Sequence, residues 1–179
     1  MLRFLVVFIG LLTLMFGLEL TPWAQAWLVA PWTDGVARAA SAVIQLFEPA
    51  VRAQGNVIGT ADGSFAVAIE AGCNGVEATL VLVAAMLAWP AGWRRRASGI
   101  LVGAFAVQGL NVIRVVSLFY LGRWNRDVFE WAHLYVWQAL IMLDVLVVWL
   151  LWMRFLPGHH PRNPPGGPLG GPPAPAAAV

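Results

Sequence analysis

The sequence predicts an all-α membrane protein that crosses the bilayer four times and keeps both termini in the cytoplasm. Of its 179 residues, 60% are hydrophobic and only 11% are charged, whereas about a quarter of a typical soluble domain is charged. Four apolar segments come close to the roughly 20 residues that a helix needs to cross a bilayer. Helix is the expected form of each, because an open sheet would leave backbone groups unpaired in lipid. The composition therefore argues against a soluble globular domain.

The expected membrane-embedded domain covers residues 1–156. Its four predicted spans lie at about 2–20, 75–91, 98–121 and 132–156. The first span has a second interpretation, since Arg3, an apolar run and Ala24-Gln25-Ala26 resemble a cleavable secretory signal. The length of the run from Phe4 to Leu18, and the interfacial character of Trp23, favour a retained helix.

Arginine residues set the predicted orientation. One side of the membrane carries six arginines and no acid, while the other carries four arginines and seven acids. By the positive-inside rule the first side is cytoplasmic, and so are both termini. Its arginines are Arg3, Arg94, Arg95, Arg96, Arg154 and Arg162. The charges that remain lie inside the spans: Glu77, Arg114 and Asp144.

Residues 21–74, between the first two spans, are expected on the outer face. Three tryptophans suit the membrane–water interface: Trp23, Trp27 and Trp32. Residues 34–47 predict an amphipathic helix that lies on the membrane surface. Its apolar face would consist of Val36, Ala40, Val43, Ile44 and Phe47. Residues 56–70 predict a small β-hairpin with Asp62-Gly63 at its turn, which delivers the chain to Cys73.

Residue counts exclude several classes of function. All eleven basic residues are arginine, so no lysine can form a Schiff base or serve a P-loop. The single cysteine rules out an intrachain disulfide and zinc sites built from several cysteines. A net charge of +2 is too small for a nucleic-acid binder, and no metal or cofactor is expected. The Pro- and Gly-rich residues 157–179 predict a disordered cytoplasmic tail, in which His159-His160 alone is a poor metal site.

Three polar residues near the outer ends of successive spans are the candidate catalytic group. Cys73 precedes the second span, Arg114 lies about 9 Å below the outer end of the third, and His133 opens the fourth. The predicted orientation rests on flanking arginines alone, so this convergence is independent of it. A thiolate is a strong nucleophile and a nearby cation lowers the thiol pKa, histidine can shuttle the proton, and arginine can stabilise an oxyanion. The combination is typical of a thiol acyltransferase or protease.

Each of these residues also has a purely structural interpretation. Cys73 could pack as a small hydrophobe, Arg114 could cap carbonyls or pair with Glu77, and His133 could be an ordinary residue of the interfacial belt. Ionisable residues within a bilayer are nevertheless functional candidates, because burying a charge there is costly.

Other polar residues of the spans are expected to support this group. Glu77 lies one turn beyond the cysteine and is expected to pair with Arg114. Asn111, one turn deeper than Arg114, is expected to orient it or to bind the substrate backbone. Gln108, another turn deeper, and Asp144, in the last span, are expected to be structural, Asp144 through a hydrogen bond between helices.

Three short motifs occur in order along the spans. They are Ala71-Gly72-Cys73-Asn74-Gly75-Val76, then Asn111-Val112-Ile113-Arg114-Val115, then the isolated His133. Over about Gly63 to Phe155 this set resembles the exosortase/archaeosortase family of membrane cysteine transpeptidases. The resemblance assigns the family's Cys, Arg and His to Cys73, Arg114 and His133. Many members have Ser or Thr where this chain has Asn74, which we count among the supporting residues, and many carry additional helices.

The resemblance also implies a substrate. Family members process exported proteins whose C-terminal sorting signal consists of a short motif, a transmembrane helix and a basic end. The short chain and its Cys-Asn-Gly-Val sequence look most like the exosortase H subgroup, whose partners carry an Ile-Pro-Thr-Leu signal. The implied partners are such exported proteins and membrane lipid. The implied location is the bacterial cytoplasmic membrane, with the active site facing the periplasm.

Function classes other than an enzyme stay open at this point. A small transporter or channel subunit would use Glu77, Arg114 and Asp144 to line a polar path, although the cytoplasmic halves of the second and fourth spans are almost wholly apolar. A non-catalytic assembly factor of the envelope would tolerate loss of Cys73. A membrane cytochrome is disfavoured, because only His133 could reach a haem within the spans.

Overall fold

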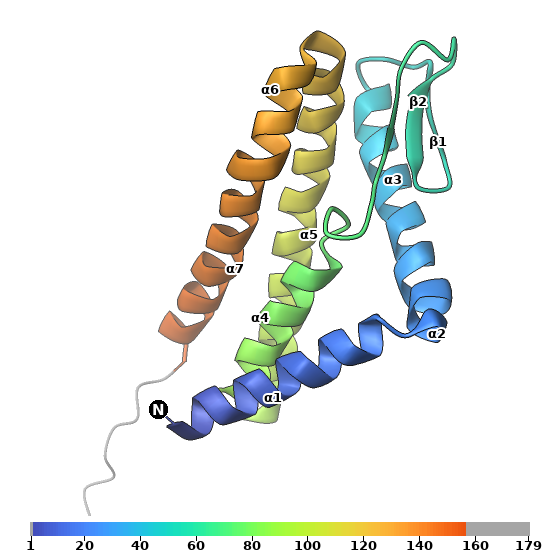
Figure 1. The fold of residues 1–179 in the computed structure, drawn as a ribbon. Coiled ribbons are helices and arrows are strands. Elements are labelled where there is room, and N and C mark those ends of the chain that lie inside the picture. The colour runs from blue at the N-terminus through green and yellow to red at the C-terminus, as the bar shows by residue number, and fades with distance from the viewer. Residues whose placement is uncertain (1, 157–179) are drawn as a thin grey trace, which may run out of the picture.

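The computed structural model describes residues 2–156 (Figure 1). Most of this chain is helical, and one small three-stranded antiparallel sheet lies between α3 and α4. The elements in chain order are α1 (Leu2–Glu19), α2 (Pro22–Ala24), η1 (Gln25–Val29), α3 (Ala30–Gln45), β1 (Val51–Gln54), β2 (Val57–Thr60), β3 (Ala66–Ala68), α4 (Val76–Ala88), α5 (Trp93–Trp124), α6 (Arg126–Trp131), η2 (Ala132–Val136) and α7 (Trp137–Arg154). Both η elements are π-helical segments of five residues. The predicted tail, 157–179, lies outside the described residues.

Three helical stretches are long and apolar enough to cross a membrane: α1, α5 and the continuous stretch Arg126–Arg154, which contains α6, η2 and α7. The predicted second span is represented by α4, which is apolar but has only 13 residues. That is about 20 Å of helix, against the ~30 Å of a hydrocarbon core. It ends early because Pro90 holds Trp89 in an extended conformation, with ψ at 137°. A fourth span and the orientation of the chain therefore stay predictions.

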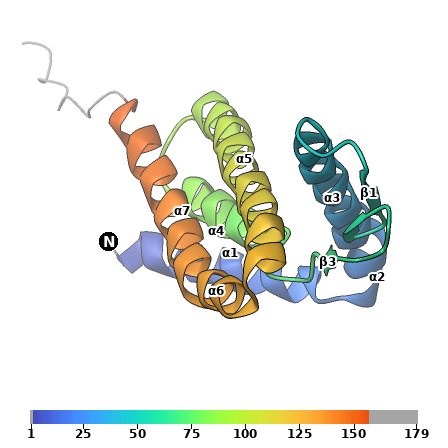
Figure 2. The same cartoon turned by 90° about the horizontal axis from the view of Figure 1, so that it is seen from above.

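Helices α4, α5 and α7 pack on one another, and α1 crosses them near one end, where it packs on α4 (Figures 1 and 2). Their shared core consists of Ala78, Leu82, Met86, Val107, Ile141 and Val145. Gly99 permits the close approach of α5 and α7, because a Cβ there would lie 2.2 Å from the indole nitrogen of Trp152. Phe4 stacks on Trp149 and meets Trp89 edge-on. These aromatic contacts hold α1 against the end of α4 and against α7.

A second unit, which we call the head, is formed by α3, the sheet and the C-terminal part of α5. The strand order is β1-β2-β3 with antiparallel pairing throughout, and Ile58 pairs with Val67. The predicted hairpin over 56–70 is confirmed as β2 and β3, and Gly63 at its turn has a φ of +71°. Strand β1 was not predicted, because its four residues, Val-Arg-Ala-Gln, are too few to show a clear alternation.

Helix α3 differs from the predicted surface helix in its start and in its buried face. It begins at Ala30 instead of residue 34. Val36, Ala40 and Ile44 are buried as predicted, but Val43 is 39% exposed and Phe47 is 75% exposed. Ala37 and Ser41 are buried in their place. The helix packs against β1, β2 and α5, and this close packing selects the face that carries small residues.

Candidate active site

A tight loop at Gly72–Gly75, which we call the cysteine loop, carries Cys73 to the start of α4. Gly72 and Gly75 have φ values of +83° and +74°, a conformation that glycine adopts without steric cost. The N–H of Cys73 donates to the carbonyl of Glu70 at 3.0 Å. At Gly75 there is also no room for a side chain, because a Cβ would lie 2.8 Å from Gln108 Nε2. The two glycines let the chain turn sharply between the sheet and α4.

The side chains of Cys73, Arg114 and His133 meet at this loop. Cys73 Sγ lies 3.8 Å from His133 Nε2, and Arg114 Nη2 donates to the sulfur at 3.5 Å. Arg114 comes from α5 and is only 2% exposed. His133 comes from η2, and its ring stacks on Phe129 with the centroids 5.7 Å apart. Three separate elements thus bring a cation and an imidazole to the sulfur of the chain's one cysteine.

Burial raises the pKa of the Cys73 thiol above its ordinary value. Arg114 beside it acts in the opposite direction, while the carboxylates of Glu77 and Glu70 add to the rise. The nearby cation lowers the thiol pKa as expected, but desolvation of the thiolate outweighs this attraction and the net shift is upward. At neutral pH the thiol is protonated and needs a base, and His133 Nε2 is the ring nitrogen that faces the sulfur.

Glu77 and Arg114 bind opposite sides of the same loop residue, Gly72. Glu77 Oε1 accepts from the N–H of Gly72 at 2.7 Å, and Arg114 Nη1 donates to its carbonyl at 3.4 Å. The expected ion pair between Glu77 and Arg114 is not found, and both ion pairs within residues 2–156 lie elsewhere. The first turn of α4 places Glu77 closer to the loop backbone than to the guanidinium. Both side chains therefore act on the position of the loop.

Asn74 ties the cysteine loop to the head. It is fully buried, its Nδ2 donates to Thr33 Oγ1 at 3.0 Å, and its carbonyl accepts from Trp32 Nε1 at 3.3 Å. Its Oδ1 accepts from the N–H of Val76, the first residue of α4. Every polar group of this side chain is thus engaged within the protein. Asn74 therefore holds the loop in place.

Gln108 and Asn111 lie beneath the loop on α5. Gln108 Nε2 donates to the Gly75 carbonyl at 2.9 Å and to Thr79 Oγ1 at 3.0 Å, so this residue supports the loop directly. Asn111 is fully buried, and neither of its amide atoms has a hydrogen-bond partner. It makes no hydrogen bond to Arg114, so the expectation that it orients the guanidinium is not met. Contact with a substrate stays its predicted role.

Asp144 is remote from this group. It lies eleven residues beyond His133 in the sequence, about 16 Å along a helix. Its Oδ2 is buried without a partner in the described chain. The expected hydrogen bond from this oxygen to another helix is therefore not found.

Sequence reasoning missed three residues around the site. Trp32 and Thr33 were placed in an interfacial belt or left unassigned, yet both hold Asn74 from a distance of about 40 residues in sequence. Glu19 was counted as an ordinary outer acid, yet it is only 8% exposed. Its position at the very end of an apolar run was the available signal, since an acid there enters the membrane layer.

Helix rise places Arg114 and His133 about one hydrocarbon thickness from the arginine-rich ends of their helices. Arg114 lies 20 residues beyond Arg94 in α5, and His133 lies 21 residues before Arg154. At 1.5 Å per residue both separations are about 30 Å. Both helices therefore give the same separation between the site and the arginine-rich ends.

Comparison with known proteins identifies the family. Residues 1–153 match the family model described as transmembrane exosortase, EpsH type. No curated protein and no solved structure matches the chain. With most of its length matched, the chain belongs to the transmembrane exosortase family, whose members are multi-pass membrane proteins that sort proteins and are generally cysteine transpeptidases.

Proposed function

We propose that this exosortase cleaves the C-terminal sorting signal of exported proteins at the outer face of the bacterial cytoplasmic membrane, through a thioester on Cys73. One observation carries the proposal: His133 Nε2 and Arg114 Nη2, from two different helices, lie 3.8 and 3.5 Å from the Cys73 sulfur. A base and a cation around a thiol are the groups that acyl transfer through cysteine requires.

The first half-reaction forms the thioester. His133 Nε2 takes the thiol proton, and the sulfur attacks the carbonyl carbon of the scissile peptide bond. Arg114 donates to the carbonyl oxygen, which becomes negatively charged in the tetrahedral intermediate. The C–N bond then breaks, and the His133 imidazolium gives its proton to the leaving amine. The released fragment keeps the transmembrane helix and the basic end.

The second half-reaction frees the enzyme. An amine or a water molecule attacks the thioester carbonyl while His133 Nε2 takes its proton. The C–S bond breaks, and the thiolate of Cys73 recovers a proton from the imidazolium. An amine leaves the exported protein joined to an acceptor, and water leaves it with a free carboxylate.

The substrate motif is proposed to be Ile-Pro-Thr-Leu, because the Cys-Asn-Gly-Val sequence resembles the exosortase H subgroup. A motif that directly precedes a transmembrane helix lies at the edge of the hydrocarbon. The depth of the site, about 30 Å from the arginine-rich helix ends, supports a substrate of this kind. Asn111 is proposed to bind the substrate backbone, because its buried amide has no partner within the described chain.

Co-expression with a tailed reporter tests the proposal. The reporter carries Ile-Pro-Thr-Leu, an apolar helix and terminal arginines, and its new C-terminus is read by mass spectrometry. Wild-type enzyme is expected to release the helix, while Cys73→Ala is expected to insert normally and leave the reporter intact. Ser98→Ala, at the other end of α5, is a control that should cleave normally. Cleavage by Cys73→Ala would overturn the nucleophile, and an intact reporter with wild-type enzyme would favour a transporter subunit or assembly factor.

A further inference from the structure

Glu19, the last residue of α1, is a buried acid that the proposed mechanism does not use. It is 8% exposed and lines a largely apolar hollow of about 290 Å³ between the end of α1, η1 and α4. Within residues 2–156 it has no ion-pair partner. An unpaired carboxylate is costly in a membrane. Its presence in an apolar hollow therefore indicates a ligand that supplies hydrogen-bond donors or positive charge.

A second hollow of about 230 Å³ continues the first toward the cysteine loop. The two hollows, which we call together the Glu19 groove, share Leu28, Val29, Val76 and Leu80. The second hollow also contacts Trp32 and Gln108. These side chains donate to the carbonyls of Asn74 and Gly75, at 3.3 and 2.9 Å. The Glu19 groove therefore runs from a buried acid to the backbone that carries the nucleophile.

The polar groups of the groove that have no partner are hydrogen-bond acceptors. Gln108 Oε1 is buried without a partner in the described chain, and Glu19 has no cation. Glu77, whose Oε2 is also buried without a partner, lies in the first turn of α4, the helix that contributes Val76 and Leu80 to the groove. The matching ligand is apolar along its sides and presents donors or positive charge. The N-terminus of an apolar helix has both properties, because its first four N–H groups are unpaired and its dipole is positive there.

We propose that the Glu19 groove receives the N-terminal turn of the substrate's transmembrane helix. This inference rests on the proposed function, in which that helix directly follows the cleaved motif and so begins at the depth of Cys73. The apolar side chains of the turn pack on Leu28 and Leu80. Its unpaired N–H groups donate to Glu19 and Gln108. The groove thus selects substrates whose helix begins immediately after the motif.

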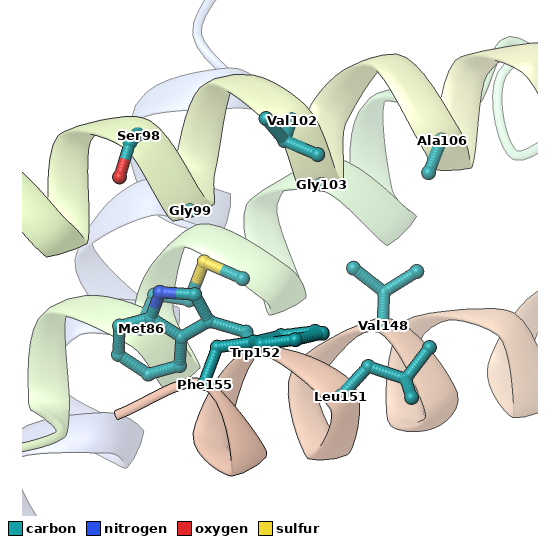
Figure 3. A pocket seen from close by; sticks show the side chains of 10 residues that line it. All are labelled: Met86, Ser98, Gly99, Val102, Gly103, Ala106, Val148, Leu151, Trp152 and Phe155. Carbon is teal, nitrogen blue, oxygen red and sulfur yellow. The ribbon is translucent and has the colours of Figure 1, made fainter. Parts of the chain in front are cut away.

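The competing surface is the groove between α5 and α7 (Figure 3). It has a volume of about 350 Å³ and is also largely apolar. Its polar side chains are satisfied, because Ser98 Oγ and Trp152 Nε1 both donate to the carbonyl of Arg95. Its outermost residue on α5, Ala106, precedes Arg114 by eight residues, which is about 12 Å of helix. This groove offers neither free acceptors nor nearness to the nucleophile.

Cysteine cross-linking tests the contact directly, because a Cys73→Ala enzyme has no other cysteine. The probe is the tailed reporter with one cysteine in the first turn of its helix. In this background Leu80→Cys, in the Glu19 groove, is expected to cross-link several-fold faster than Ile113→Cys. Ile113, the neighbour of Arg114 on α5, is 58% exposed and does not line the groove. Leu151→Cys, paired with a probe whose cysteine is in the last helical turn, tests the competing groove.

The outcomes are distinguishable. Equal or faster cross-linking at Ile113→Cys overturns the inference. So does cross-linking at Leu151→Cys with none at Leu80→Cys, or no cross-linking of a probe that wild-type enzyme cleaves. A reporter that wild-type enzyme does not cleave overturns the proposed function, and the inference falls with it.

The substitution Glu19→Gln tests whether the negative charge of Glu19 contributes to substrate binding. We expect KM for the reporter to rise about three- to tenfold with little change in kcat, because a neutral amide interacts more weakly with a helix dipole. Glu130→Gln, an exposed acid on α6, is the matched control and should leave both constants unchanged. Alkylation of Cys73 by a small maleimide should proceed at the wild-type rate in Glu19→Gln, whereas a displaced loop would alter it. An unchanged KM overturns the role of Glu19.

Discussion

The head and the layer around the cysteine loop differ in how their buried polar groups are paired. In the head, apolar side chains such as Ile44, Ile58 and Phe119 share one core. Among buried side-chain atoms of the described chain that lack a hydrogen-bond partner, the head contributes only the Tyr120 hydroxyl. The layer around the loop contributes six such atoms, on Glu77, Gln108, Asn111, Arg114 and His133.

This difference distinguishes the head, which supports the cysteine loop, from the layer around the loop, where the reaction is proposed to occur. Proteins pair nearly all of their buried polar atoms, so a concentration of exceptions needs an explanation. In the head the polar groups that matter are used internally, since Trp32 and Thr33 hold Asn74. Around the loop the free donors and acceptors surround the one nucleophile. We infer that the head is a scaffold and that the loop layer keeps its polar groups for the substrate.

Removal of His133 should have the largest effect. His133→Ala is expected to lower kcat/KM by about 10²- to 10⁴-fold, the usual contribution of a general base. Because burial raises the pKa of Cys73, the thiol without its base stays protonated at neutral pH. The residual rate should therefore rise about tenfold per pH unit until the pH reaches the raised pKa of the thiol. A pH–rate profile of reporter cleavage measures this.

The control for that experiment is Leu134→Ala, the neighbouring residue, which is 60% exposed. It should cleave at the wild-type rate with the wild-type pH dependence. A residual rate in His133→Ala that does not change with pH would show that histidine does not deprotonate the thiol.

Two substitutions of Arg114 should have the next largest effect, and they separate its charge from its shape. Arg114→Gln removes the charge that opposes burial, so the pKa of Cys73 should rise further and its alkylation should shift to higher pH. Arg114→Lys keeps a charge but cannot reproduce the planar fork that reaches both Gly72 and the sulfur. It should keep more of the alkylation profile yet lose about 10²-fold in kcat. Full activity in Arg114→Lys would contradict a role for the fork.

Much of this arrangement could be predicted from local sequence. Apolar run lengths predicted the membrane class and three of the long helices, and Asp62-Gly63 predicted the hairpin turn. The positions of Arg114 and His133 near the outer ends of their predicted spans indicated that the two side chains lie in one layer, because helix rise is constant. The family motifs pointed to the same residues.

What sequence could not provide depends on contacts between distant segments. The support of Asn74 comes from α3, about 40 residues away, and no local pattern encodes it. The net pKa shift of Cys73 depends on how deeply the loop is buried, which the sequence does not show. The partner of Glu77 depends on the sharp turn at Gly72, which brings a backbone N–H closer than the guanidinium.

A methyl group at Gly75 should have a moderate effect on stability and a larger one on activity. Gly75→Ala must adopt a φ of +74°, which costs a non-glycine residue about 1–3 kcal/mol. Its Cβ also meets Gln108 Nε2 at 2.8 Å, so the support of the loop must shift. Gly109→Ala, where a Cβ meets nothing within 4 Å, is the matched control and should be neutral or stabilising. Unfolding in detergent and reporter cleavage measure both; wild-type values in Gly75→Ala would contradict a tightly held loop.

The smallest effect is expected in the head. Arg123 pairs with Glu48 and lies over the Phe119 ring at 5.8 Å, but its side chain is 38% exposed and that of Glu48 32%. Solvent screening limits such a pair, so Arg123→Ala should lower the free energy of unfolding by less than about 1 kcal/mol. Cleavage should be unchanged, because the pair joins the outer end of α5 to the turn after α3, away from the cysteine loop. A large loss of activity at wild-type stability would mean that the head takes part in catalysis, since a scaffold that keeps its fold keeps Asn74 in place.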